Sequence, residues 1–200
     1  MKHGTPVAAP GLRIGLLGGS FDPPHDGHMH ITRRAFRRFG LDWIWWLVSP
    51  GNPLKEDAPA SLGRRMAACR AIATHPRVKV TDIEARLGTR YTADTLARIR
   101  ALYPGVRFVW LMGADNLTGF HRWDHWQDII ERTPIGVLAR PGAQVAAGLS
   151  PAARAYSRYR MPKEAARALP LCAAPAWTLL SGPMVETSST VLRARGKWIR

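Results

Sequence analysis

The stretch GLLGGSFDPPHDGHMHI, residues 15–31, places two adjacent glycines, two adjacent prolines and three histidines directly after an apolar run. The run itself, Leu12–Leu17, is short and apolar and predicts a buried strand. Gly18 and Gly19 would then form the turn that leaves the strand. Because glycine permits a sharp bend and a close approach of the backbone to a ligand, we expect a binding site at this turn.

A helix is predicted after the turn. Ile31, Ala35 and Phe39 recur at a spacing of four and would form one buried face, and Gly40 is suited to end the helix. The opposite face carries four arginines, which we interpret as a solvated surface and not as a site: Arg33, Arg34, Arg37 and Arg38.

Two histidines lie at the start of this helix. His28 falls in its first turn and His25 lies three residues earlier. Unpaired N–H groups at a helix N-terminus favour phosphate, so both imidazoles are candidates to face a bound anion. A zinc site is an alternative, but no further cluster of Cys or His accompanies them. Plain surface polarity is the other alternative, which a glycine-rich strand-to-helix turn makes less favourable.

The rest of the chain alternates short apolar runs with helical patterns. Runs that predict further strands are Trp43–Val48, 78–80, 106–112 and 135–139, and helical spacing marks Leu62–Ala73, with Ser61 as its cap, and Leu96–Tyr103. This alternation predicts an α/β fold with a doubly wound parallel sheet, which binds ligands beyond the carboxyl ends of its strands. The pattern fades over 143–183, where residues 152–160 could form a basic helix.

Composition narrows the class of protein. Lys and Arg number 29 against 14 Asp and Glu, a formal charge of +15 that attracts anions. No apolar run is long enough to cross a membrane. Residues 1–11 lack the apolar stretch of a signal peptide and predict a flexible tail before a single domain, 12–200. Cys69 and Cys172 have no metal-binding spacing, so we expect reduced thiols in the cytoplasm.

Known phosphate-binding signatures, GxxxxGK[ST] and GxGxxG, are absent, but HDGH at 25–28 matches HxGH. GGSFDPP precedes it, and five further motifs follow: PGNPLK (50–55), RYTADTL (90–96), LMGADNLTGFHRWDHW (111–126), ARPG (139–142) and TSSTVLR (187–193). From about Leu12 to Arg193 the chain resembles the bacterial nicotinate-nucleotide adenylyltransferase family. Ser20 stands where the family usually has Thr, and Leu192 where it often has Ile.

The resemblance implies a Rossmann-like fold and adenylyl transfer from ATP to nicotinate mononucleotide, giving nicotinate adenine dinucleotide and pyrophosphate. It also implies Mg²⁺ bound through the ATP phosphates, with no metal site on the protein. Expected partners are the two nucleotides, and a homo-oligomer is compatible with the resemblance. Neither a membrane nor nucleic acid is expected as a partner.

The resemblance also assigns residues to roles. Catalytic roles go to His25, His28 and Arg193. ATP-binding roles go to Gly18, Gly19, Ser20, Phe21, Gly113, Asp115, Ser188, Ser189 and Thr190. Mononucleotide-binding roles go to Lys55, Thr92, Trp123 and Arg140. Taken as residues alone, Trp123 could be a core tryptophan, Thr92 a helix cap, Asp115 a solvated acid, and Lys55 and Arg140 surface cations.

Two alternatives remain open. Another HxGH nucleotidyltransferase, or a preference for nicotinamide mononucleotide, would use the same phosphate-binding motifs. A nucleic-acid-binding module would explain the charge and the arginine-rich helix, but not the glycines and histidines. For the transferase, the attacking phosphate is already largely ionised at neutral pH, so the sequence needs to supply positioning and electrostatic stabilisation and no general base.

Overall fold

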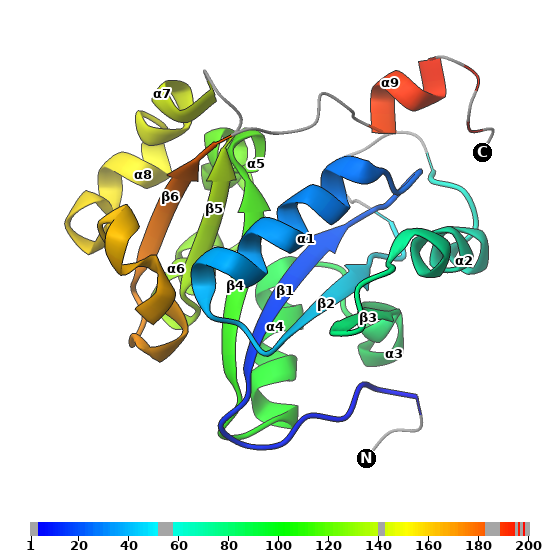
Figure 1. Ribbon diagram of the computed structural model, residues 1–200, viewed down its shortest axis with the longest axis horizontal. Helices are drawn as coiled ribbons and strands as arrows, with labels where there is room; N and C mark the ends of the chain where they lie inside the picture. Colours follow the sequence, from blue (N-terminus) through cyan, green and yellow to red (C-terminus); the bar gives the residue numbers. More distant parts are fainter. Residues whose placement is uncertain are drawn as a thin grey trace.

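The computed structural model describes residues 4–51, 58–139, 143–182, 189–194, 196 and 198. Over these residues a six-stranded parallel sheet carries helices on both faces (Figure 1). The strands are β1 (Arg13–Gly19), β2 (Trp43–Val48), β3 (Val78–Thr81), β4 (Arg107–Gly113), β5 (Ile135–Ala139) and β6 (Trp177–Ser181). Their order is β3-β2-β1-β4-β5-β6, so the direction of winding reverses between β1 and β4. The predicted doubly wound, Rossmann-like fold is confirmed, and a ligand crevice is expected at that reversal.

The helices form one layer on each face of the sheet. They are α1 (Asp26–Phe39), α2 (Leu62–Ile72), α3 (Ile83–Leu87), α4 (Thr92–Leu102), α5 (Ala114–Gly119), α6 (Trp126–Arg132), α7 (Ala143–Gly148), α8 (Pro151–Ala155) and α9 (Ser189–Ala194), with 3₁₀ turns η1 (Phe120–Arg122), η2 (Ser157–Tyr159) and η3 (Lys163–Leu171). Within the described ranges, no helix is both long and apolar enough to span a bilayer.

Each face of the sheet has its own apolar core. Trp45 and Trp46 are neighbours in β2, and both are buried, yet they belong to different cores. Trp45 packs with the α3–α6 side and Trp46 with the α1 and α2 side. This two-sided burial explains why the strand shows no alternation of apolar and polar residues, as the sequence predicted.

The two glycines of the opening stretch lie inside β1 and not in the turn expected after it. Gly18 pairs with Leu47 of β2. A Cβ atom on Gly18 would lie 2.3 Å from the ring of Trp110, so the glycine makes room for an indole of the neighbouring strand. The backbone adopts a positive φ two residues after β1 instead, at Phe21, where φ is +46°.

Helix α1 buries a different face from the predicted one. Ala35 and Phe39 are fully buried as predicted, but Ile31 is only half-buried, and Met29 and Thr32 complete the face. Thr32 accepts a 2.9 Å hydrogen bond from the indole of Trp46, which explains a polar residue at a buried position. The predicted stop at Gly40 is confirmed, with a left-handed φ of 58°.

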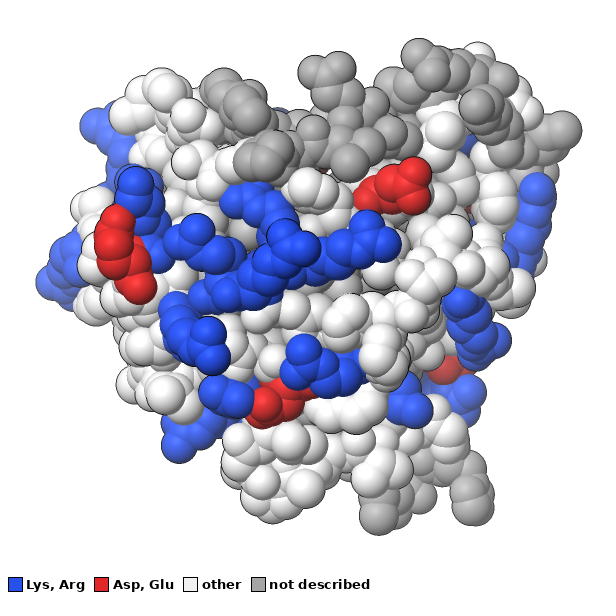
Figure 2. Space-filling view, in the orientation of Figure 1, with Lys and Arg blue, Asp and Glu red and all other residues white. Residues whose placement is uncertain are grey.

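The arginine face of α1 is only partly solvated. Arg33 and Arg37 are exposed, and Figure 2 shows basic side chains gathered over the face that α1 covers. Arg34, however, donates to the Ser181 carbonyl at 2.7 Å, and Arg38 donates to the Lys163 carbonyl at 3.1 Å. These two arginines therefore tie α1 to β6 and η3.

The segment 143–183 holds several features that the sequence pattern missed, and outside it α3 and α6 were not predicted either. β6 was not predicted, because a five-residue edge strand among Ala and Pro residues gives little periodic signal. The basic helix expected over 152–160 is broken into α8 and η2. The Tyr156 carbonyl, at the break, accepts a 2.7 Å hydrogen bond from the Trp177 indole.

Residues 4–11 contact the domain at the end of α4. The Tyr103 hydroxyl donates to the Pro6 carbonyl at 2.6 Å, and the Gly11 amide donates to the Gly105 carbonyl at 2.8 Å. The division into a flexible tail, 1–11, and a domain, 12–200, stays a prediction.

A buried arginine joins the loops at the carboxyl ends of β1 and β2. The side chain of Arg65, in α2, is 1% exposed. Its guanidinium donates to four carbonyls at 2.6–3.2 Å, those of Ser20, Ser49, Pro50 and Ala60. Backbone carbonyls in loops lack the regular hydrogen-bond donors that a sheet or a helix provides. One guanidinium with several N–H donors supplies hydrogen bonds to carbonyls that would otherwise be buried without a partner.

We predict that Arg65→Met destabilises the fold by at least about 3 kcal/mol, because it leaves several buried carbonyls without donors. Urea denaturation measures this change. Arg70→Met, at an exposed position of the same helix, is the matched control and is expected to stay within about 0.5 kcal/mol of wild type. Equal midpoints for the two variants would contradict the role of Arg65.

Candidate active site

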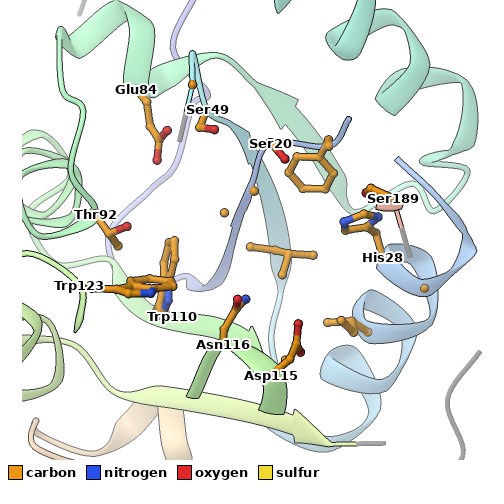
Figure 3. A pocket seen from close by; sticks show the side chains of 18 of the residues that line it. Ser20, His28, Ser49, Glu84, Thr92, Trp110, Asp115, Asn116, Trp123 and Ser189 are labelled. Atoms are coloured by element: carbon orange, nitrogen blue, oxygen red, sulfur yellow. The ribbon is translucent and has the colours of Figure 1, made fainter. Parts of the chain in front are cut away.

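A cavity of about 950 Å³ opens at the carboxyl ends of β1 and β4, where the sheet reverses (Figure 3). Its walls come from the end of β1, the start of α1, the starts of α4 and α5, the segment before α6, and α9. Twelve predicted site residues line it together: Gly18, Gly19, Ser20, Phe21, His25, His28, Thr92, Gly113, Asp115, Trp123, Ser189 and Thr190. Lys55, Arg140 and Ser188 lie outside the described residues.

The two histidines complete the N-terminus of α1 for each other. His25 is the N-cap residue, and its Nδ1 accepts from the Gly27 amide at 3.1 Å. Nδ1 of His28 accepts from the His25 amide, also at 3.1 Å. The ring centroids are 4.0 Å apart. A neutral imidazole whose Nδ1 accepts a hydrogen bond carries its proton on Nε2, so in each ring the N–H lies on the nitrogen that does not cap the helix.

His28 is held in the neutral form. Burial lowers its pKa to about 3, and the neighbouring His25 adds to the effect. The ring lies 4.6 Å from Phe21 and 6.0 Å from Trp46, centroid to centroid. At neutral pH His28 therefore offers a hydrogen bond to an anion and no positive charge.

A buried aspartate, which the sequence analysis did not single out, holds α9 against the loop before α1. Asp22 is 2% exposed, and its Oδ1 accepts from the Trp198 indole at 2.7 Å and from the Ala60 amide at 3.2 Å. Arg193 donates to the Asp22 carbonyl and lies 4.0 Å from its carboxylate. Ser189 donates to the Pro23 carbonyl at 2.8 Å.

Arg193 is thus placed next to the cavity through Asp22 and is not among the residues that line it. Its second Nη atom lies 3.4 Å from the hydroxyl of Thr190, which does line the cavity. The predicted cluster of Ser189, Thr190 and Arg193 is therefore on the same side of the molecule as the two histidines.

The far side of the cavity is aromatic. Trp123 packs edge-on against Trp110, at 6.3 Å between centroids, and against Phe120, at 5.4 Å. It is half-buried and also lines the cavity, so its core packing and a binding role are compatible. Thr92 is the first residue of α4 and lines the cavity, but the cap position belongs to Tyr91. The reading of Thr92 as a helix cap is therefore wrong.

Asp115 lies in the first turn of α5, exposed at the cavity wall. Two arginines that the sequence analysis passed over also line the cavity, Arg90 and Arg122. They are sequence neighbours of the aromatic side, two residues before Thr92 and one before Trp123. In a chain with so many basic residues, a single arginine in the sequence is weak evidence for a binding site. Only the fold shows that Arg90 and Arg122 lie at the cavity wall.

Glu84 is the least expected residue of the site. It lies in α3, is 7% exposed and lines the cavity. Burial raises its pKa to about 7, and no ion pair compensates the carboxylate within the described part of the chain. The segment IEARL has the pattern of an ordinary short amphipathic helix. The sequence therefore gives no indication that Glu84 lines a binding cavity.

Comparison with known proteins assigns the chain to a class. Residues 16–195 match the family model described as cytidylyltransferase-like. The chain is 61% identical over 198 residues to the "Probable nicotinate-nucleotide adenylyltransferase" of Ruegeria pomeroyi, covering 99% of this chain and 93% of that protein. A protein of the same name from Roseobacter denitrificans is 59% identical over 199 residues, with both chains covered in full.

The fold is shared with solved structures. The nicotinic acid mononucleotide adenylyltransferase of Plasmodium falciparum, complexed with NaAD, superposes with a TM-score of 0.67 at 16% identity. The match covers 92% of this chain and 83% of the other. The chain is thus a cytidylyltransferase-like nucleotidyltransferase by fold and by family model. Within that class its close relatives put it in the nicotinate-nucleotide adenylyltransferase family, as the motifs predicted.

The buried Glu84 gives the protein a pH-dependent stability. Well below pH 4.5 the residue is protonated whether the chain is folded or unfolded. As the pH rises toward 7, the unfolded chain releases this proton but the folded chain keeps it, so folding loses stability. We predict that Glu84→Gln, which does not titrate, gains about 3 kcal/mol relative to wild type between pH 4.5 and pH 8.

Urea denaturation of both proteins across this pH range measures the difference. The difference at pH 4.5 is the reference value, because there Glu84 is protonated in the folded chain and only about half ionised in the unfolded chain. A difference that stays constant with pH would contradict a buried, unpaired carboxyl group.

Proposed function

We propose that the chain transfers the adenylyl group of ATP to nicotinate mononucleotide, with release of pyrophosphate. The observation that carries this proposal is one cavity with two chemically different sides. Imidazole N–H groups at the N-terminus of α1 suit a polyphosphate, and the aromatic side with Thr92 and Trp123 suits a flat pyridine ring. Such a cavity can hold two nucleotides with their phosphates facing each other.

In the proposed reaction a phosphate oxygen of the mononucleotide attacks the α-phosphorus of ATP. A new O–P bond forms, the bond between the α-phosphorus and the bridging oxygen breaks, and pyrophosphate leaves with that bonding pair. The attacking oxygen is largely ionised at neutral pH, so no group of the protein needs to remove a proton. Catalysis then consists of bringing two anions together and stabilising the charge on the transferring group.

His25 and His28 would donate to the phosphates of ATP from their Nε2 atoms. Neutral imidazoles suit this task for two reasons. Hydrogen bonds from the backbone already orient the rings, and a neutral ring does not pay the desolvation cost of a charged donor. Thr190 would add a hydroxyl donor, and Arg193 would add positive charge from its anchored position beside Asp22. Ser189, which lines the cavity, would have to release the Pro23 carbonyl before its hydroxyl could donate to a phosphate. These roles, with those of Ser188, Lys55 and Arg140, stay predictions.

Mg²⁺ would accompany the triphosphate. Mg²⁺ commonly binds through substrate phosphates and water, so the oxygens of ATP would hold it. Within the described residues no group of three or more His, Cys, Asp or Glu side chains is arranged to hold a metal. When bound, the ion would neutralise phosphate charge. The cytoplasmic location, which two unpaired cysteines support, and the possible homo-oligomer also stay predictions.

We predict that the purified protein releases pyrophosphate when given ATP, Mg²⁺ and nicotinate mononucleotide together, and not when either nucleotide is omitted. A coupled phosphate assay with pyrophosphatase measures the release, and mass spectrometry identifies the dinucleotide. Replacing ATP with CTP controls for the donor base. No dinucleotide with ATP would refute the proposed reaction.

We predict that His28→Ala lowers kcat at least about a hundredfold, or about 3 kcal/mol, because it removes one donor directed at developing charge. His30→Ala is the matched control, on the same helix but outside the cavity wall, and is expected to keep near wild-type turnover. Circular dichroism checks that both variants fold. Wild-type turnover in a folded His28→Ala protein would remove His28 from the mechanism.

A further inference from the structure

Glu84 has no role in the reaction as described so far. A site that collects two phosphorylated substrates should avoid buried negative charge, yet this carboxyl group lies at the cavity wall and is almost fully buried. Burying a carboxyl group without a partner is costly, and proteins that tolerate the cost often do so at functional sites.

The fold places Glu84 on the side of the cavity that carries the pyridine-binding candidates. The Glu84 carbonyl accepts from the Thr89 amide at 3.0 Å, and the Thr89 hydroxyl accepts from the Thr95 hydroxyl at 2.8 Å. These buried bonds fix α3 against the start of α4, where Thr92 lies. Figure 3 shows Glu84, Thr92 and Trp123 on one side of the cavity, with His28 and Ser189 on the opposite side, and the Glu84 carboxyl group points into the space between.

No charged neighbour accounts for the carboxyl group within the described residues. β2, which packs on α3, has no titratable side chain. On α3 itself Arg86 pairs with Asp82 at 2.6 Å, and on α4 Arg98 donates to the Leu87 carbonyl. The other charged or titratable groups of α4 and the cavity wall are Asp94, Arg100, His25, His28, Arg90, Tyr91, Asp115, Arg122 and Asp124. Burial is the cause that raises the pKa of Glu84.

We propose that Glu84 is a specificity-determining residue, which in its protonated form donates a hydrogen bond to the carboxylate on the acceptor's pyridine ring. This inference rests on the proposed function, because it needs a pyridine mononucleotide as the acceptor. A protonated carboxyl group is a strong donor to a carboxylate, and an ionised one would repel it. An ionised Glu84 would instead accept a hydrogen bond from the amide of nicotinamide mononucleotide.

Selectivity between the acid and the amide should therefore depend on pH. The measurement is the ratio of kcat/KM for nicotinate mononucleotide to kcat/KM for nicotinamide mononucleotide, from pH 6 to pH 9. The two acceptors share their phosphate, ribose and ring, so titration of the phosphate or of the histidines acts on both and cancels in the ratio. Because the pKa of Glu84 is raised to about 7, we expect the wild-type ratio to fall about tenfold for each pH unit above it.

Three variants separate this role from a structural one. Glu84→Gln keeps a neutral donor of the same shape, so its ratio should not change with pH. Glu84→Ala removes the donor and should lower the ratio at pH 6 about tenfold or more. Asp94→Asn removes an exposed carboxyl group outside the cavity wall and should keep the wild-type profile.

A wild-type ratio that does not change with pH would overturn the proposal, as would a Glu84→Gln protein that keeps the wild-type slope. The wild-type slope requires no variant, so the proposal stays testable even if a substitution prevents folding. If neither acceptor yields pyrophosphate at any pH, the proposed function fails. If both are turned over at a constant ratio, only the role of Glu84 fails.

Discussion

The reciprocal cap of His25 and His28 is the interaction on which the site depends. Each ring uses its Nδ1 to satisfy a backbone N–H at the start of α1. The same bonds fix which nitrogen carries the ring proton and where it points. A helix N-terminus normally needs a Ser, Thr, Asp or Asn cap, and here the capping residues are also the candidate phosphate donors. The helix cap and the proposed phosphate-binding role therefore require the same residues, a histidine at each end of HDGH.

Two buried charged residues hold the loops around that cap. Arg65 binds four carbonyls from the segments after β1 and β2 and before α2, and Asp22 links the loop before α1 to Trp198 and Arg193. Loops at the ends of parallel strands have no regular partners for their backbone groups, and a long multidentate side chain supplies them. The walls of the cavity are therefore set by side chains that do not line it.

The fold was predictable where the signal was local. Unalternating apolar runs such as Trp43–Val48 predicted a parallel sheet, and Gly40 predicted a helix end, because both reflect short-range constraints. The reason for Gly18 was not predictable, since it depends on an indole from β4, far along the chain. Arg65 and Glu84 were missed for the same reason. Their types are common on surfaces, and only the tertiary fold buries them.

The two sides of the cavity differ in the charged side chains that the structure describes there, and this difference agrees with the proposed roles. On the histidine side, burial keeps His28 neutral, and Arg193 is anchored to Asp22. In the proposed reaction, the described side chains on this side would stabilise phosphate charge through an oriented imidazole donor and one anchored cation. On the aromatic side, Arg90 and Arg122 are exposed at the wall, and the excess positive charge is spread over surfaces such as that of α1 (Figure 2). Positive charge on the surface raises the local concentration of anionic substrates. Hydrogen-bond donors inside the cavity, such as His28, would then orient the bound phosphates.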